Sequence, residues 1–155
     1  PPPCDLPYSL TMIVRMARFV FLFTVAVLLI ACSGPLEMQV RGDDQMNGGG
    51  NPAVVRIYQL SGESSFRRTT AADFWANDVA QIRDELIGRP QDVMVYPGEE
   101  RSLTLEPSDD AQFIGFAVDL RNPNRDLWRA IHPVSDLKGE RVTLEVLSDR
   151  LDVRF

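Results

Sequence analysis

Two patterns of hydrophobic and polar residues divide this chain of 155 residues. Residues 19–31 form a largely apolar run of thirteen residues without a charge, with Arg18 before it and Cys32 after it. A run of this length is typical of a signal peptide, because a helix needs about 20 apolar residues to span a bilayer. From residue 36 onward, apolar and polar residues alternate in short segments instead. This period of two predicts strands that bury one face each.

The alternating part of the chain predicts about eight short strands separated by turns. Glycine, proline, asparagine and aspartate gather between the segments, as in Pro97-Gly98 and residues 122–126, and these residue types favour turns. The segment 54–60 is apolar almost throughout, which indicates a central strand. The predicted strands cover residues 36–41, 54–60, 93–95, 103–105, 112–120, 128–131, 141–146 and 151–155. Such an arrangement predicts an all-β sandwich of two sheets.

One region has helical periodicity, and it predicts a small helical insertion at about residues 64–88. Thr70 is suited to cap the helix, with Asp73 near its positive end. Gly88 and Pro90 are typical stop signals. Apolar residues at spacings of three and four form one stripe, which we expect to pack on the sandwich: Ala71, Trp75, Val79, Ile82 and Leu86.

The connection between the first two strands, residues 42–52, contains no branched aliphatic residue and carries three successive glycines. Glycines flanked by asparagine and proline predict a flexible loop. Such a loop adds nothing to a core and costs ordering entropy, so the pattern favours a role outside the core, such as contact with a partner. The alternative is a passive connection, since eleven residues exceed the usual hairpin length only moderately.

Cys32 ends the tetrapeptide LIAC at residues 29–32, which resembles the lipobox of bacterial lipoproteins. The resemblance implies a signal peptide at residues 16–31, cleavage before Cys32, and acylation of the Cys32 thiol and of the new amino terminus. An ordinary signal peptide or a short anchor with an incidental cysteine is the alternative. Because Ser33 and not aspartate follows the cysteine, the same resemblance implies sorting to the outer membrane.

The predicted mature chain, residues 32–155, contains 124 residues and is acidic. Residues 1–15 are interpreted as upstream translation or an extended n-region, with the start at Met12 or Met16. The whole chain has 16 basic and 22 acidic residues, which leaves the mature chain with a net charge of −7. This length predicts a single domain, and the negative charge argues against a nucleic-acid partner.

Cysteine and histidine are too few to predict metal or catalytic chemistry. Cys4 lies upstream and Cys32 is predicted to carry lipid, so no disulfide is expected and the domain must be held by packing. His132 is the sole histidine, and we interpret it as a structural or surface residue. The motifs of serine hydrolases and phosphate-binding loops are absent from the sequence. The sequence therefore predicts no enzyme, no metal and no cofactor besides the lipid on Cys32.

The order of several segments behind the lipobox resembles the TssJ family of outer-membrane lipoproteins of type VI secretion. These segments are VVRIYQL at residues 54–60, YPGE at 96–99, FAV at 116–118 and LWRA at 127–130. The resemblance implies a transthyretin-like sandwich with a helical addition, anchored by lipid at the periplasmic face of the outer membrane. It also implies a tethering role, in which the protein binds the periplasmic domain of the inner-membrane subunit TssM and connects indirectly to TssL.

In that family the loop between the first two strands contacts TssM, and by order along the chain it corresponds to residues 42–52 here. The residues expected to make this contact are Asp43, Asp44, Gln45, Met46 and Asn47. Met46 is the only sizeable apolar side chain among them, and a flexible thioether suits an adaptable contact.

A different function remains open from the residues themselves: a periplasmic lipoprotein whose sandwich binds a small ligand or a cell-wall glycan. Such a site usually exposes aromatic rings on a concave surface. Trp75 and Trp128 lie in apolar, periodic contexts, which predicts core packing for both and argues against this alternative.

Overall fold

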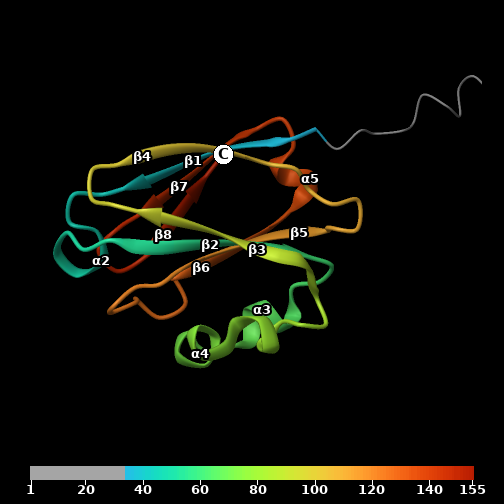
Figure 1. Ribbon diagram of the computed structural model, residues 1–155, viewed down its shortest axis with the longest axis horizontal. Helices are drawn as coiled ribbons and strands as arrows, with labels where there is room; N and C mark the ends of the chain where they lie inside the picture. The colour runs from blue at the N-terminus through green and yellow to red at the C-terminus, as the bar shows by residue number, and fades with distance from the viewer. Residues whose placement is uncertain (1–33) are drawn as a thin grey trace, which may run out of the picture. The chain divides into compact units, whose positions relative to one another are not determined.

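Eight strands form two four-stranded sheets in the part of the chain that the computed structural model describes, residues 34–155 (Figure 1). The predicted signal peptide at residues 16–31, Cys32 and Ser33 lie outside the described residues. The first sheet has the order β4-β1-β7-β8 and the second has the order β3-β2-β5-β6. The expected all-β sandwich is confirmed.

All neighbouring strands are antiparallel except β1 and β7, which run parallel. The first sheet contains β1 (Leu36–Gly42), β4 (Glu100–Leu105), β7 (Arg141–Val146) and β8 (Leu151–Arg154). The second contains β2 (Ala53–Leu60), β3 (Leu86–Val95), β5 (Phe113–Val118) and β6 (Arg129–Pro133). A short helix that the periodicity did not predict, α5 (Val134–Leu137), follows β6.

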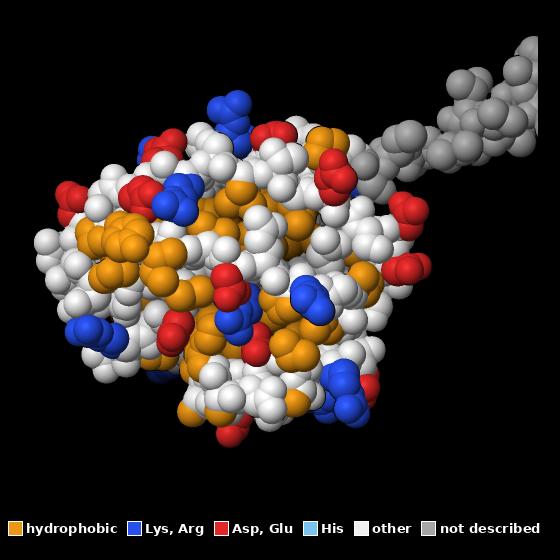
Figure 2. Space-filling view, in the orientation of Figure 1, with side chains coloured by type: hydrophobic (Ala, Val, Ile, Leu, Met, Phe, Trp, Pro, Cys, Tyr) orange, Lys and Arg blue, Asp and Glu red, His pale blue; other side chains and the backbone are white. Residues whose placement is uncertain are grey.

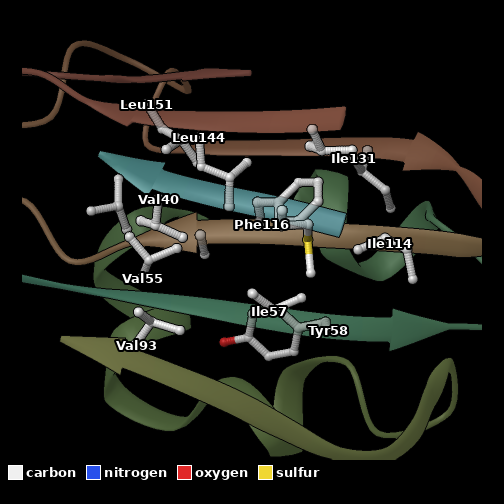
Figure 3. Close-up of a cluster of buried hydrophobic side chains, with 14 of the residues drawn as sticks. Val40, Val55, Ile57, Tyr58, Val93, Ile114, Phe116, Ile131, Leu144 and Leu151 are labelled. Atoms are coloured by element: carbon white, nitrogen blue, oxygen red, sulfur yellow. The ribbon is translucent and has the colours of Figure 1, made fainter. Parts of the chain in front are cut away.

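The core lies between the two sheets and is built from the inward-facing residue of each alternating pair (Figure 3). In β1, Val40 is buried and its neighbour Arg41 is exposed, as a strand with one wet face requires. Figure 3 shows Val40 and Leu144 of the first sheet facing Val55 and Phe116 of the second. Buried apolar side chains of both sheets form one hydrophobic cluster.

The helical segment consists of α3 (Ser64–Arg68) and α4 (Ala71–Gln81), and it is shorter than the predicted one. The cap prediction is confirmed, because the Thr70 side chain accepts a hydrogen bond from the Asp73 backbone N–H. Leu86 does not continue the helix; it begins β3 and pairs with Leu60 of β2. The Leu86 N–H still donates to the Ile82 carbonyl, and the Ser61 N–H donates to the Glu85 carbonyl, so pairing with the end of β2 begins where the last turn ends.

The predicted apolar stripe of α4 is only partly correct. Ile82 is fully buried and Trp75 packs against the core, but Val79 is 44% exposed. The helix is interrupted at Asn77, whose φ of −165° and ψ of 70° are not helical. The buried side of this segment contains Phe74, Asp78 and Ile82 at spacings of four, so Asp78 is buried where the predicted stripe placed Val79.

Helices α3 and α4 cover the outer face of the second sheet with a cluster of aromatic rings. Phe74 of α4 lies at its centre, and its ring centroid is 4.9 Å from that of Trp128. Gly115 of β5 makes room for the cluster, because a Cβ there would lie 3.0 Å from the Phe66 ring. The aromatic cluster consists of Tyr58, Phe66, Phe74, Trp75 and Trp128. This second buried face explains why β2 is apolar almost throughout.

Candidate functional site

Four connections between strands meet at one end of the sandwich, which we name the α2 end. They join β1 to β2, β3 to β4, β5 to β6, and β7 to β8, and the first of them contains the short helical turn α2 (Met46–Gly49). In Figure 1 this end lies at the left, whereas the described chain enters β1 at the opposite end. The predicted partner-binding residues of the first connection therefore have neighbours from three other parts of the chain.

The β1–β2 connection is folded back onto the sheets by backbone hydrogen bonds, which corrects the expectation of a flexible loop. The Asp43 N–H donates to the Val146 carbonyl at 3.0 Å. The Gly42 N–H donates to Glu99, and the Gly42 carbonyl accepts from Gly98. A side chain at Gly42 would collide with the Tyr96 carbonyl, so this close approach requires glycine.

Met46 is fully buried and belongs to the hydrophobic core, so the expectation of an exposed, adaptable thioether is wrong. The α2 turn places this side chain in the same hydrophobic cluster as the buried residues of both sheets. Burial of an apolar side chain of this size contributes roughly 1.5–3 kcal/mol relative to exposure. The connection was predicted to add nothing to the core, and Met46 shows that it does.

Asn47 is also buried, with 5% of its surface exposed, and it has left-handed backbone angles of φ 49° and ψ 51°. Its Nδ2 donates to the Pro52 carbonyl at 2.8 Å. Its Oδ1 accepts from the Arg121 backbone N–H at 2.8 Å, which links it to the β5–β6 connection. Glycines 48–50 all have positive φ, so the glycine run serves the turn geometry.

The β7–β8 connection binds both neighbours through its backbone. The Asn47 and Gly48 N–H groups donate to the Leu147 and Ser148 carbonyls at 3.1 and 2.9 Å. On the other side, the Asn124 N–H donates to the Asp149 carbonyl at 2.8 Å. The α2, β5–β6 and β7–β8 connections thus form one continuous, hydrogen-bonded surface.

The side chains that this surface presents are Asp44 and Gln45, which are exposed, and Asp43, which is half-buried. Asp43 Oδ1 accepts from the Gln45 N–H at 2.8 Å and so shapes the turn from within. Two large apolar side chains on neighbouring connections are exposed, Tyr96 at 49% and Leu127 at 47%. Figure 2 shows hydrophobic side chains gathered at this end of the visible face. Polar groups beside exposed apolar side chains are the composition of a protein-recognition surface.

A family model described as type VI secretion lipoprotein, with members named VasD, EvfM and TssJ, matches residues 35–149. The chain belongs to this family. The TssJ resemblance expected from the sequence is therefore confirmed. No curated protein sequence matches the chain.

Solved structures share the fold of this family member at low sequence identity. A chain described as "Type VI membrane complex" has 24% identity and a TM-score of 0.70, covering 78% of this chain and 98% of that one. A chain described as "T6SS protein TssM C-terminal domain (869-1107) from EAEC" also has 24% identity, with a TM-score of 0.67 and the same coverage. The lipoprotein TssJ1 from Pseudomonas aeruginosa has 18% identity and a TM-score of 0.67, covering 79% of this chain and 95% of that one. These similarities support the β-sandwich.

A polar network that the sequence did not predict attaches α4 to the sheet in this type VI lipoprotein. Asp78, 8% exposed, accepts from the Tyr58 hydroxyl at 2.6 Å and from Arg56 Nη1 at 2.8 Å. Burial alone would raise the pKa of Asp78, but the hydrogen bonds from Tyr58, Arg56 and the Val79 N–H, together with the charge of Arg56, lower the pKa below its usual value. Burial, together with the bond to Asp78, raises the pKa of Tyr58. The network holds a paired charge and has a structural role, because each group already has its partner.

Arg129 of β6 also attaches the helical segment to the second sheet. Its guanidinium donates to the backbone carbonyls of Phe66, Arg67 and Thr69, and it pairs with Asp126 at 3.2 Å. The Arg129 Cζ also lies 4.8 Å from the centre of the Trp128 ring. Carbonyls at the end of α3 are left without helical partners, and the arginine satisfies them.

His132 is half-buried in β6, and its ring packs edge-to-face on Phe155 with centroids 5.1 Å apart. Burial lowers the pKa of His132 below its usual 6.5. In the part of the chain that the structure describes, no three His, Cys, Asp or Glu side chains gather to hold a metal ion. The arrangement around His132 fits the structural interpretation.

The two tryptophans were expected in the core, and both lie in the aromatic cluster. Trp128 is 1% exposed, so it offers no platform for a sugar ring. Within residues 34–155, no helix has the length and hydropathy needed to cross a bilayer.

Proposed function

We propose that this type VI lipoprotein tethers the secretion membrane complex to the outer membrane by binding the periplasmic domain of a TssM-like subunit. The family match over residues 35–149 carries the proposal, because it covers nearly all of the described domain. Two proteins of the same fold are described as parts of a type VI membrane complex and of a TssM C-terminal domain structure. A TssL-like subunit would be an indirect partner, reached through TssM.

The anchor in this proposal is the lipid predicted on Cys32, and Ser33 supports sorting to the periplasmic face of the outer membrane. One acyl chain binds a membrane only marginally, whereas the three chains of a bacterial lipoprotein give stable attachment. Residues 33–35 alone separate Cys32 from the start of β1. Lipid at Cys32 would therefore keep the entry to β1 near the membrane and leave the opposite, α2 end for a partner.

The docking surface in this proposal is the α2 end, with Asp44 and Gln45 as its central contacts. Their exposure supports this role, whereas Met46 and Asn47 act from inside because both are buried. The role requires no bond-making chemistry, so we propose a non-enzymatic assembly protein without a cofactor.

The test uses two matched double variants of the full chain. In Asp44→Ala/Gln45→Ala the exposed side chains of the α2 end are removed while the buried ones stay. In Asp109→Ala/Asp110→Ala an exposed acidic pair is removed from the turn before β5, at the other end of the sandwich. We expect only the first variant to lose co-purification with the periplasmic domain of TssM and to lose secretion. Wild-type binding and secretion by the first variant would place the interface elsewhere.

A further inference from the structure

We propose that Asn47 is the positioning residue that holds three connections of the α2 end in one prearranged docking surface. The proposal rests on the proposed function for the identity of the partner, the periplasmic domain of a TssM-like subunit. It adds that the partner binds a surface formed from the α2, β5–β6 and β7–β8 connections together. Asn47 joins them through its side-chain amide, which bonds the β5–β6 connection, and through its backbone N–H, which bonds the β7–β8 connection.

Three demands meet at this position, and asparagine satisfies all of them. The backbone is left-handed, a conformation that glycine, asparagine and aspartate adopt far more readily than other residues. The side chain must donate a hydrogen bond to the Pro52 carbonyl and also accept one from the Arg121 N–H. Glycine offers neither group, and aspartate offers the acceptor without the donor.

The bonds of Asn47 join parts of the chain that are far apart in sequence. Its Oδ1 reaches Arg121, which is 74 residues away, on the β5–β6 connection. Its backbone N–H reaches Leu147 of the β7–β8 connection. At 5% exposure, water cannot replace these partners without opening the site. Removal of the amide therefore takes away the side-chain partner of the Pro52 carbonyl and of the Arg121 N–H at once.

The exposed side chains of the surface depend on this arrangement. Asp44 and Gln45 directly precede the α2 turn, and the exposed Leu127 lies on the same β5–β6 connection as Arg121. A partner that contacts both connections binds more tightly when their positions are fixed beforehand, because less ordering entropy is lost in the complex. Loss of the amide should weaken binding without removing any contact side chain.

The experiment compares Asn47→Gly and Asn47→Asp in the full mature chain in detergent. Both variants accept the left-handed backbone, but Asn47→Gly loses both side-chain bonds and Asn47→Asp loses only the donor. Asn77→Gly is the matched control, because Asn77 lies in α4, where its Oδ1 accepts from the Ala80 N–H. Amide hydrogen exchange is measured without partner, and association with the purified TssM periplasmic domain is measured by calorimetry and surface kinetics.

We expect the Arg121 and Gly48 amides of Asn47→Gly to exchange at least about tenfold faster while the amides of both sheets keep their rates. The affinity for TssM should fall about tenfold, with slower association and a less favourable binding entropy. Asn47→Asp should lie between Asn47→Gly and wild type, and Asn77→Gly should match wild type in both measurements. If Asn47→Gly does not fold, the exchange rates and the affinity of Asn47→Asp decide whether Asn47 is a positioning residue.

Wild-type affinity in Asn47→Gly, or unchanged exchange at Arg121, would overturn the positioning role while leaving the proposed function intact. Failure of the wild-type protein to bind TssM would overturn the proposed function and the choice of partner. In that case the exchange rates still decide whether Asn47 holds the connections together.

Discussion

Replacing Phe74 by alanine tests whether the helical segment is an integral part of the domain. Phe74 is fully buried between α4 and the outer face of the second sheet. Its ring centroid lies 4.9–5.6 Å from those of four other rings. The substitution would leave a cavity at the centre of the aromatic cluster, where no neighbouring ring can close it without losing another contact.

The expected cost follows from this burial. Deletion of a buried phenylalanine side chain costs about 3–5 kcal/mol, and each well-placed aromatic pair adds about 0.5–1.5 kcal/mol beyond its area. With four neighbouring rings we expect the upper part of that range, about 4–5 kcal/mol. A domain of this size is stable by about 5–15 kcal/mol, so the loss is a large share of the total.

Tryptophan fluorescence during urea unfolding measures this loss at the right place, because both tryptophans of the chain belong to the aromatic cluster. At a slope of about 2 kcal/mol per molar urea, the midpoint should fall by about 2 M. Val79→Ala is the control on the same helix, since Val79 is 44% exposed, and it should change stability by less than about 0.5 kcal/mol. A loss below about 1 kcal/mol in Phe74→Ala would refute the docking of α4.

Three further predictions concern charge, pH and the anchor. Asp78→Asn should cost about 1–3 kcal/mol, because it leaves Tyr58 without a charged acceptor and Arg56 with Asp92 as its remaining carboxylate partner. The lowered pKa of Asp78 means that its stabilisation is present above the usual value of 3.8 and is lost as the pH falls through the folded-state pKa. Below about pH 4, the free energy of unfolding should therefore depend less steeply on pH in Asp78→Asn than in the wild type. Equal slopes would contradict this. An NMR titration should give His132 a pKa below 6.5. The unfolded chain then binds more protons than the folded one, so the free energy of unfolding should fall as the pH drops below 6.5. This fall should be smaller in His132→Gln. Cys32→Ser should yield a folded protein in the soluble periplasmic fraction that does not support secretion, and fractionation with outer membranes would show that Cys32 is not the anchor.

The strands could be predicted from the sequence because the alternation of apolar and polar residues is a local property. The turns between them could be predicted because glycine and proline favour turns through their own backbone geometry. The start of β3 could not be predicted in this way. Gly88 and Pro90 were interpreted as signals that stop a helix, but they lie inside β3. β3 is an edge strand, and an edge can hold proline because one side of the strand needs no donors. The position of a strand within its sheet decides this, and that position depends on pairing across the chain.

The inward rotation of Asp78 depends on tertiary partners in the same way. Tyr58 and Arg56 are 20 and 22 residues away from it in sequence, and both lie on β2. A prediction from hydrophobic periodicity places aspartate on the exposed side of a helix, because an unpaired carboxylate is costly to bury. Two donors on the underlying strand reverse that preference.

The glycine-rich connection shows why composition predicted the right place and the wrong physical state. Glycine and asparagine were correct signals of unusual backbone angles, and residues 47–50 all have positive φ. Flexibility does not follow from those angles, because hydrogen bonds to three other connections and the buried Met46 hold the turn. Replacing residues 43–47 by glycine and serine would therefore remove a core side chain together with the contact side chains. Loss of secretion after that change would prove nothing about the interface. Only variants that separate the exposed Asp44 and Gln45 from the buried Met46 and Asn47 can tell partner contact from folding.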